Sequence, residues 1–299
     1  KIALGGWSDW AAVGNAENAK AIAKQVGSMV LSTFSDGIDL DFEHLFEFNQ
    51  IHGAEYDAFA TLINEIRTEF DTTVTDGWMQ SAQDALDWYN CTYNALEDWE
   101  KSGAYFYTTN MQYMTDILAN PVPHFDISWT TRFNAFVPQD DPLNYLMPDS
   151  PMPNSTFDTD NEGTFFWDAI ADAVDNVNIM AYDASGLMLN DSQVLVNFVE
   201  LGNVPAMKIN MGYEPGNQAA GGVWEGEEED KTSIQFISDN GYGGAMIWAI
   251  NSDESENPDS YEWCPKIAAD ANTILSPGFP YPDLTPSFTK VDATTGWLA

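Results

Sequence analysis

Residues 36–43 read DGIDLDFE, and this stretch decides the fold prediction because it sets acidic side chains into an apolar strand pattern. Successive side chains of a β-strand point to opposite faces, so the acids after Gly37 share one face and the residues between them share the other. The acidic face holds Asp39, Asp41 and Glu43, and the apolar face holds Ile38, Leu40 and Phe42. We therefore expect the apolar face to pack beneath helices and the acidic face to carry chemistry.

The three acids lie too close together to stay ionised in a poorly solvated interior, so at least one should hold its proton at neutral pH. Glu43 is the most C-terminal of them and would lie nearest a substrate, which suits a general acid. Asp41 beside it would share a proton and tune its affinity. Two other interpretations of the spacing stay open: a calcium site, since alternating carboxylates suit a hard cation, and a solvated edge strand.

Short apolar runs alternate with helical patterns along most of the chain, which is typical of βα units and a parallel sheet. Six strands are predicted, near residues 1–7, 36–43, 124–137, 176–183, 206–214 and 243–251. Helices are predicted near residues 16–34, 55–70, 165–174, 193–201, 231–240 and 261–275. Four strands end in polar or aromatic residues, as a barrel with its chemistry at the strand C-termini requires. A doubly wound sheet is disfavoured because no GxGxxG motif opens a helix.

The composition fits one large core and a strongly acidic surface. The chain has 299 residues, 44% of them hydrophobic, and carries 47 Asp and Glu against 10 Lys and Arg, a formal charge of -37. Such a charge repels DNA, RNA and anionic lipid, so we expect no nucleic-acid partner and no membrane insertion. It suits a solvated surface in high salt or a calcium-rich medium, and a specific cationic partner is the other interpretation.

Sequons at Asn90, Asn154 and Asn190 favour a secreted, extracellular glycoprotein. No run approaches the roughly 20 apolar residues that would cross a bilayer. Only Cys91 and Cys264 are present, and one disulfide between them and two buried free thiols both fit the sequence. The three histidines have no metal-ligand spacing, which argues against a His-based transition-metal centre. The general-acid interpretation of the carboxylates implies no metal and no cofactor.

The opening stretch resembles the signature DGxDxDxE of the glycoside hydrolase family 18 chitinases at every fixed position. Three further segments are similar to family segments in the same order. They are KIALGGWSDW at 1–10 (third strand), NIMAYD at 178–183 (sixth-strand MxYD) and GGAMIWAINSD at 243–253 (eighth strand). The resemblance covers residues 1–275 and implies an α/β fold, a TIM (β/α)8 barrel in which strands 3 to 8 are recognisable.

The resemblance implies a retaining hydrolase of chitin or chito-oligosaccharides that uses no enzyme nucleophile, an exception to the two-carboxylate scheme. Glu43 would protonate the glycosidic oxygen and later act as the base. Asp41 would orient the acetamido group of the substrate, whose own oxygen attacks the anomeric carbon to form an oxazolinium ion. Asp39 would support Asp41 from below, and Tyr182 would hydrogen-bond the acetamido oxygen.

The same resemblance implies the residues that bind the sugar at the -1 subsite, which are Met180, Asp183 and Trp248. Further aromatic residues near strand ends are candidates for extending the cleft, because barrel strand ends carry function. These candidates are Tyr213, Trp129, Trp7 and Trp10. The aromatic-rich segment 71–122 would either wall a deep groove or serve as a partner surface.

We expect residues 1–275 to form one catalytic barrel, with 71–122 as an insertion or elaborate loop, and 276–299 to form a Pro-rich tail. The family fold has two strands before the Gly-pair segment, so an N-terminal segment or another chain would complete the barrel. His44 and Leu45 stand where the family often has Tyr-Pro, and Phe42 where it often has Trp or Tyr. These departures concern substrate preference and remove no catalytic group.

Three functions stay open at this point. The first is a hydrolase of N-acetylglucosamine polymers, the second an endo-β-N-acetylglucosaminidase acting on N-glycans, and the third a non-catalytic chitinase-like lectin or structural module. The presence of Glu43 disfavours the third, because such proteins usually lose the acid. A fold alone does not choose among them.

Overall fold

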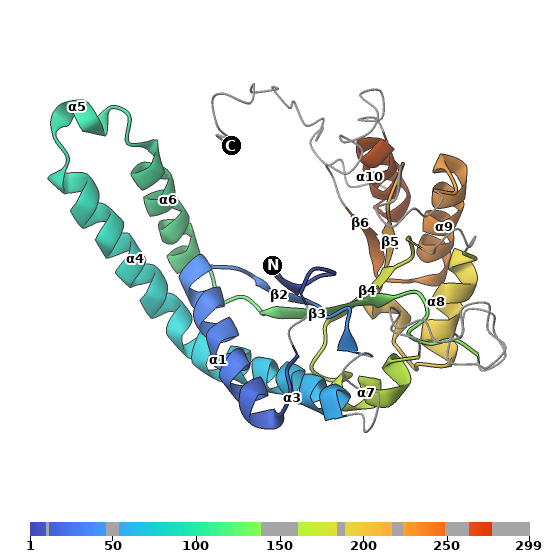
Figure 1. Cartoon of the computed structure of the whole chain (residues 1–299). Coiled ribbons are helices and arrows are strands. Elements are labelled where there is room, and N and C mark those ends of the chain that lie inside the picture. Colours follow the sequence, from blue (N-terminus) through green and yellow to red (C-terminus); the bar gives the residue numbers. More distant parts are fainter. Residues whose placement is uncertain are drawn as a thin grey trace.

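A computed structural model of the chain describes residues 1–9, 12–45, 54–138, 161–183, 189–216, 224–248 and 263–276. Six strands form one sheet in the order β1-β2-β3-β4-β5-β6, and each strand runs parallel to the next (Figure 1). The strands are β1 (Ile2–Gly5), β2 (Gly37–Asp41), β3 (Asp126–Arg132), β4 (Asn176–Met180), β5 (Ile209–Tyr213) and β6 (Gly244–Ile247). All six predicted strands are confirmed. Within the described residues the sheet ends at β1 and β6, two strands short of a barrel.

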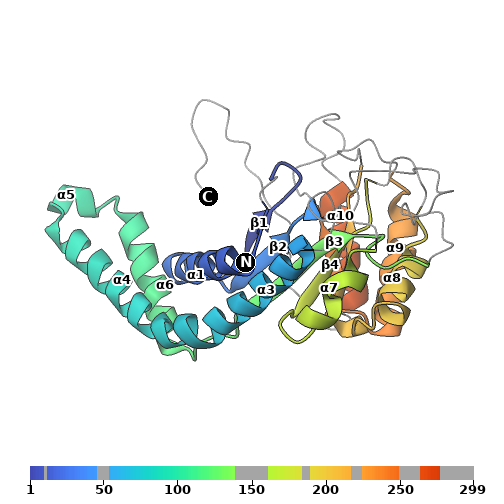
Figure 2. The ribbon, with the colours of Figure 1, turned by 60° about the horizontal axis from the view of Figure 1, so that its bottom comes forward.

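Helices connect the strands and lie together on one side of the sheet (Figures 1 and 2). They are α1 (Ala16–Thr33), α3 (Ala54–Glu69), α7 (Gly163–Ile170), α8 (Asp191–Glu200), α9 (Glu227–Asn240) and α10 (Trp263–Leu275), with a short 3-10 helix, η2 (Ala206–Lys208), before β5. The six helices predicted from apolar spacing are therefore present. No helix among the described residues is long and apolar enough to cross a membrane.

The two faces of the sheet differ sharply in polarity. On the helix side, two side chains of each central strand are fully buried: Ile38, Leu40, Ile127, Trp129, Val177, Ile179, Ile209 and Met211. The opposite face carries polar side chains, among them Asp39, Thr130 and Asn178. The apolar half of the opening stretch thus anchors β2 in the core, where truncating Leu40 to Ala would cost about 2–5 kcal/mol. The acidic half faces away from the helices.

The glycine of the signature has a steric role at the entrance of β2. Gly37 has a φ of 147°, and a Cβ atom on it would lie 2.0 Å from the carbonyl oxygen of Asp126 in β3. Any side chain at this position would push the two strands apart. The same holds at the end of β1, where a Cβ atom on Gly5 would lie 2.0 Å from the carbonyl oxygen of Asp41. Both glycines therefore allow neighbouring strands to pair closely with β2.

A helical hairpin projects from the sheet and is named here the arm; Figures 1 and 2 show its two long helices side by side, with α5 at the tip. A π-helical turn, η1 (Phe70–Val74), joins α3 to α4 (Thr75–Ala95), which is followed by α5 (Asp98–Lys101) and α6 (Tyr105–Ala119). The prediction for this segment was an aromatic-rich insertion or elaborate loop, without the helices that the structure shows. Few arm side chains are buried, so the helical period in apolar residues is weak.

The base of the arm lies at the N-terminal ends of the strands. Trp78 of α4 packs edge-on against Phe34, which precedes β2, and against Phe125, which precedes β3, with ring centroids 5.3 and 5.0 Å apart. The C-terminal ends of β2 and β3 are at the opposite edge of the sheet. The base of the arm therefore lies at the edge opposite the acids, which disfavours a wall over them and leaves the partner surface as a prediction.

The disulfide considered from the sequence is not formed. Cys91 is exposed on α4 and Cys264 is buried in α10, and no disulfide joins them. The alternative of two buried thiols is wrong for Cys91 as well, since the arm leaves it exposed. Trp10, Asn154 and the predicted tail from residue 277 lie outside the described residues.

Candidate active site

Because all six strands are parallel, their C-terminal ends meet at one edge of the sheet, and this edge gathers most of the predicted site residues. β2 contributes Asp41 and, in the turn after it, Glu43. β4 contributes Met180 and leads into Tyr182 and Asp183. β1 leads into Trp7, and β6 leads directly into Trp248.

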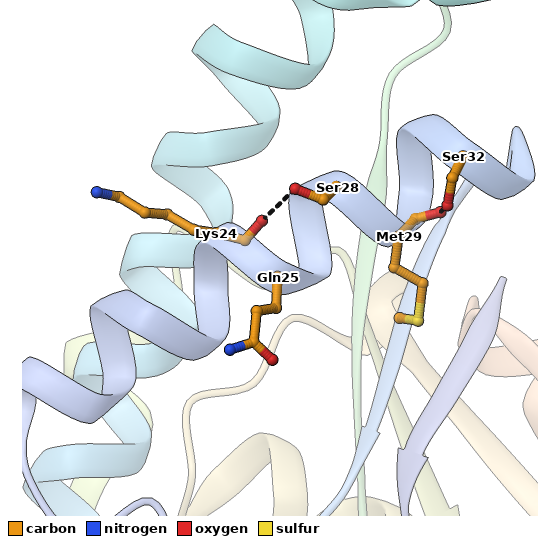
Figure 3. A pocket seen from close by; sticks show the side chains of 5 residues that line it. All are labelled: Lys24, Gln25, Ser28, Met29 and Ser32. Carbon is orange, nitrogen blue, oxygen red and sulfur yellow. Dashed lines mark hydrogen bonds between the residues drawn. The ribbon is translucent and has the colours of Figure 1, made fainter.

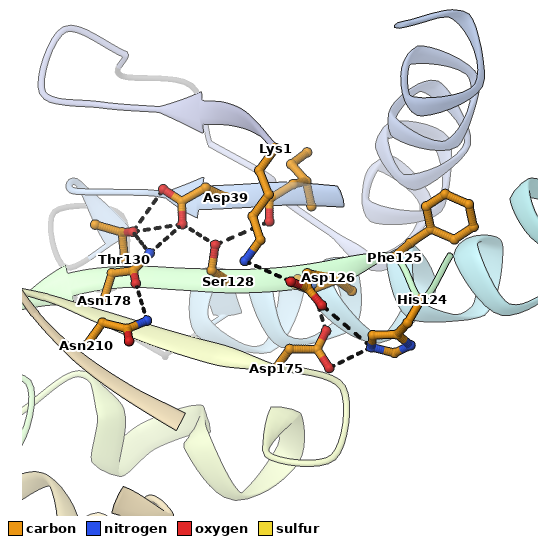
Figure 4. Close-up of polar contacts among 12 residues, drawn as sticks. Lys1, Asp39, His124, Phe125, Asp126, Ser128, Thr130, Asp175, Asn178 and Asn210 are labelled. Carbon is orange, nitrogen blue, oxygen red and sulfur yellow. Dashed lines mark hydrogen bonds and ion pairs between the residues drawn. The ribbon is translucent and has the colours of Figure 1, made fainter. Parts of the chain in front are cut away.

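Asp39 lies one layer below this edge and is held by hydroxyl and amide donors from the next two strands (Figure 4). Ser128 and Thr130 of β3 donate to its carboxylate, the Thr130 bonds being 2.9 Å long. Asn178 of β4 donates to the same carboxylate at 3.0 Å, and Asn210 of β5 donates to Asn178 at 3.0 Å. Asp39 is therefore a fixed acceptor, and its negative charge contributes to the proton affinity of Asp41 above it.

Asp41 is the carboxyl group that holds the proton expected from the sequence. Burial, followed by the charges of Glu43 and Asp39, raises its pKa from 3.8 to about 8, while the nearby Arg132 opposes the rise. At pH 7 the group is mostly protonated. Its Oδ1 atom is buried and has no hydrogen-bond partner among the described residues. A buried oxygen of this kind is costly in a native fold unless a further polar group satisfies it.

Glu43 stands at the rim, next to Trp7 and His44. Burial raises the pKa of Glu43; the charges of Arg132 and His44 and the backbone N–H of Trp7 act against the rise. His44 Nε2 donates to the carbonyl oxygen of Trp7 at 2.8 Å, and the two rings lie 4.8 Å apart. His44, which follows Glu43, thus holds the segment after β1 close to this acid. Trp7 itself is half exposed, as a residue that contacts a ligand must be.

Tyr182 and Trp248 form an aromatic pair beside the acids. Their rings are stacked at 6.0 Å with an interplanar angle of 14°, and 44% of Trp248 is exposed. Burial and the charges of Asp41 and Glu214 raise the pKa of the Tyr182 phenol, which therefore keeps its proton and can donate a hydrogen bond. Gly212 of β5 leaves the space for this ring, because a Cβ atom there would lie 3.0 Å from Tyr182 Cε1.

Arg132, at the C-terminal end of β3, is a charged residue of the candidate site that was not predicted from the sequence. Its guanidinium lowers the pKa values of Asp41, Glu43 and Tyr182 and is the positive charge common to all three. Nη2 also donates to the backbone carbonyl of Asp183 at 3.2 Å. Asp183 takes a left-handed backbone conformation with a φ of 56°, which is uncommon for a non-glycine residue. Arg132 thus contacts the backbone of β4 where that strand turns away from the site.

Two predicted cleft residues, Trp129 and Tyr213, lie on the wrong face of their strands. Trp129 is fully buried and packs against Phe166 and Trp167 of α7, at 5.1 and 5.9 Å between ring centroids. Tyr213 is buried toward α9, where its hydroxyl lies 2.7 Å from Ser233 Oγ. Both predictions are corrected: these rings belong to the core between sheet and helices.

The two-residue period of side chains along a strand explains why Trp129 and Tyr213 were wrongly predicted to line the cleft. It also indicates which residues lie on the correct face. In β3 the residues that share the face of Asp39 are Ser128, Thr130 and Arg132, which alternate with Trp129. In β5 the corresponding residues are Asn210 and Gly212, and the next one is Glu214, which is buried. A strict application of strand alternation would have named Arg132 and Glu214.

Comparison with known structures supports the α/β fold with a parallel sheet. No family model and no curated protein matches the sequence. Catalytic domain 2 of the Ostrinia furnacalis Group II chitinase, solved in a mutant form with penta-N-acetylchitooctaose, superposes with a TM-score of 0.52 at 11% identity. The match covers 91% of this chain and 76% of that chain. The chain has a family 18 chitinase-like fold.

Two further structures are similar at lower scores. A GH18 chitinase from Pseudoalteromonas aurantia matches with a TM-score of 0.48 and 16% identity, covering 85% of this chain and 69% of that chain. An endo-β-N-acetylglucosaminidase from Cordyceps militaris matches with a TM-score of 0.43 and 12% identity, covering 91% and 69%.

Away from the site of this chitinase-like fold, His124, Asp126 and Asp175 bring metal-ligand atoms within 4.8 Å of one another at the N-terminal edge of the sheet (Figure 4). The protein itself supplies cations there. Arg67 pairs with Asp175, and Lys1 Nζ lies 3.4 Å from Asp126. The pKa of Asp175 is lowered by the backbone N–H of Ile127, by His124 and by Arg67, against the effect of burial. The cluster is an ion-pair network that joins α3 to the strand entrances.

A shallow hollow of about 530 Å³ lies on the outer side of α1 (Figure 3). It is lined by Lys24, Gln25, Ser28, Met29 and Ser32, all from one helix, and Ser28 already donates to the carbonyl of Lys24. It is remote in the fold from the strand C-termini and offers no pair of groups suited to acid-base chemistry. Two of the sequon residues are exposed, Asn90 on α4 and Asn190 at the N-cap of α8, where its side chain accepts from the N–H of Gln193.

Proposed function

We propose that this chain is a secreted retaining glycoside hydrolase that cleaves β-1,4-linked N-acetylglucosamine polymers. One observation carries the proposal: a protonated Asp41, a rim acid Glu43 and a phenol donor Tyr182 converge at the strand C-termini beside the exposed ring of Trp248. The oligosaccharide bound to the similar chitinase domain supports the substrate class. Exposed Asn90 and Asn190 are compatible with glycosylation and hence with secretion.

In this proposal the first half-reaction breaks the glycosidic bond without a protein nucleophile. Glu43 gives its proton to the glycosidic oxygen, and the acetamido oxygen of the substrate forms a bond to the anomeric carbon as the leaving alcohol departs. The product is a cyclic oxazolinium ion, and Glu43 is left as a carboxylate. The raised pKa of Glu43 serves this step because a general acid must hold its proton near the working pH.

The second half-reaction uses the same carboxylate as a base. A water molecule attacks the anomeric carbon from the face that the alcohol left, Glu43 takes its proton, and the carbon–oxygen bond of the oxazolinium ring breaks. Two inversions at one carbon retain the anomeric configuration. Tyr182 donates to the acetamido oxygen, and Asp41 pairs with the acetamido N–H, which gives its unpartnered Oδ1 a polar neighbour.

Trp248 and Trp7 supply the apolar contacts in the proposal. The exposed ring of Trp248 continues the stack of Tyr182 and offers a flat platform for the sugar bound at the point of cleavage. Trp7 lies next to Glu43 and would contact the sugar on the other side of the scissile bond. This arrangement gives specificity because Asp41 and Tyr182 hydrogen-bond the N-acetyl group of the sugar. The aromatic side chains contact the apolar face of the pyranose ring.

The proposal is tested with fluorogenic chitobiose and chitotriose substrates and a high-mannose glycoprotein, using wild type, Glu43→Gln and Glu17→Gln. Glu17 is an exposed acid of α1, so the control makes the same chemical change away from the site. We expect release from the chito-oligosaccharides, a loss of about 10²–10⁴-fold in Glu43→Gln, and no change in Glu17→Gln. Release from the glycoprotein alone would identify an N-glycan enzyme instead. Chitin binding without turnover would identify a lectin.

A further inference from the structure

The arm exposes an unusual number of aromatic side chains. The exposed fractions are 56% for Trp88, 76% for Trp99, 75% for Tyr105, 62% for Phe106 and 46% for Tyr113. If an aromatic side chain offers about 150–250 Å², these five together leave on the order of 600 Å² of ring surface in water. Soluble monomers seldom expose that much apolar surface without a binding role.

Two of the exposed rings, Trp88 and Phe106, belong to one cluster of ring contacts that also includes Tyr89 and Tyr107. Phe106 of α6 contacts Tyr89 of α4 at 5.9 Å and its neighbour Tyr107 at 5.4 Å, and Tyr107 contacts Trp88 at 6.4 Å. These contacts link the two helices near the tip, where α5 adds Trp99. The large apolar side chains that remain exposed on the arm are all aromatic, whereas the aliphatic Leu86, Leu96 and Ile117 are half-buried.

The acidic charge of the arm limits which kinds of partner can bind to it. Residues 75–119 contain seven acidic residues and one cation, Lys101. That cation is already engaged, since its Nζ lies 3.9 Å from Asp98 and 6.0 Å from the centre of the Tyr93 ring. An anionic lipid surface or nucleic acid therefore meets repulsion, and a second copy of a chain with a charge of -37 does too. A neutral or a cationic ligand meets no such repulsion, so the polar groups beside the rings have to decide between them.

Polar groups beside the rings suit a hydroxylated neutral ligand. A shallow hollow of about 440 Å³ on α6 is lined by Thr108, Thr109, Gln112, Tyr113 and Asp116. Four of these offer hydroxyl or amide groups without charge. Trp and Tyr side chains present an apolar face together with an N–H or O–H, which matches the apolar face and hydroxyl rim of a pyranose ring.

We propose that the arm is a second carbohydrate-binding surface, which holds the face of a neutral β-linked polysaccharide through Trp88, Trp99, Tyr105 and Phe106. The polymer would be chitin, a point that rests on the proposed function. The tip lies about 25 Å beyond Trp78, counting about 1.5 Å per residue along α4, and the base of the arm is at the edge of the sheet opposite the acids. A strand bound there is not the one being cleaved. The arm instead keeps the enzyme on an insoluble polymer and raises the effective concentration of chain segments at the site.

The test compares wild type with the variant Trp99→Ala/Tyr105→Ala/Phe106→Ala and with the control Leu201→Ala/Met207→Ala, which removes exposed apolar side chains outside the arm. Binding to chitin powder is measured by sedimentation with Glu43→Gln added to each protein, so that hydrolysis does not interfere. Activity on soluble fluorogenic chitotriose is measured with Glu43 intact, and mass in solution by light scattering.

We expect the arm variant to bind chitin at least 5-fold more weakly, with unchanged activity on the soluble substrate, while the control matches wild type in both. Equal chitin binding by wild type and the arm variant would overturn the inference. So would a wild-type dimer that the arm variant loses, since the occupant would then be a second copy. Arm-dependent binding without hydrolysis by wild type would refute the proposed function and leave the arm surface standing.

Discussion

At the scale of single residues, the site depends on one guanidinium among several carboxyl groups. Arg132 lowers the pKa values of Asp41 and Glu43, which burial raises. Activity requires the proton on Glu43, whose pKa burial raises above its ordinary value, so wild-type kcat/KM should fall on the alkaline side of neutrality.

Replacing Arg132 tests this electrostatic arrangement. Arg132→Met removes the charge that opposes the rise, so both pKa values increase and the alkaline limb of kcat/KM moves to higher pH. Arg132→Lys keeps a positive charge and should leave the limb closer to that of wild type. The measurement is a pH–rate profile on soluble chitotriose. An alkaline limb that stays in place or moves to lower pH in Arg132→Met would contradict the role assigned to Arg132.

Asp41 should support activity while its ionisation lowers the stability of the fold at alkaline pH. Its folded pKa of about 8 exceeds the ordinary value of 3.8, so its contribution to stability is present below about pH 4 and is lost as pH rises through about 8. Asp41→Asn cannot ionise. It should be more stable than wild type at pH 9 by at least about 1 kcal/mol, since one unit of pKa shift corresponds to about 1.4 kcal/mol. At pH 4 the two should match.

Urea unfolding at the two pH values measures this difference, and chitotriose turnover measures the accompanying loss of activity. Equal stability of wild type and Asp41→Asn at pH 9 would show that Asp41 is ionised without cost, against the burial seen in the structure.

At the scale of the strand, which face a side chain takes decides its role. Tyr213→Phe removes the hydroxyl that contacts Ser233 on the helix side, so it should lower the free energy of unfolding by about 1 kcal/mol and leave kcat/KM unchanged. Trp248→Ala should do the reverse: kcat/KM falls at least 10-fold, and stability changes little because the ring is half exposed. Denaturant melts and kinetics on both variants check this pair. A drop in kcat/KM for Tyr213→Phe would place Tyr213 back in the cleft.

The same rule explains what the sequence could and could not predict. Alternation in DGIDLDFE placed Asp39, Asp41 and the apolar residues on their faces, because both faces are marked by residue type. In β3 and β5 the aromatic residues Trp129 and Tyr213 were predicted to line the cleft because of their type. The polar residues that alternate with them lie on the inner face instead. The hydrogen bonds around Asp39 join three strands that are far apart in sequence, and no local pattern reveals them.

At the scale of the whole molecule, parallel strand order was predictable from the alternation of apolar runs and helices, and the arm was not. Its helices bury few side chains, so the aromatic residues follow no core-facing period. Its direction is set by Trp78 packing against Phe34 and Phe125, contacts between segments more than 40 residues apart.

The charge of -37 should make stability depend on salt. Self-repulsion destabilises the compact state, and about 1 M salt reduces the Debye length to about 3 Å. Tm should therefore rise by several degrees between 0.05 and 2 M NaCl, since about 1 kcal/mol corresponds to about 2–4 °C for a domain of about 150–250 residues. Calorimetric scans measure it. A flat or falling Tm over this range would show that the acids are spaced widely enough to repel one another little.

The central claim is that Glu43 acts with the acetamido group of the substrate as the nucleophile. The most direct measurement is the anomeric form of the first products of chitohexaose hydrolysis, followed by proton NMR before mutarotation, in wild type and Glu43→Gln. The account predicts β-anomer products from wild type and none from Glu43→Gln. Initial α-anomer products, or β-anomer release that survives in Glu43→Gln, would contradict it.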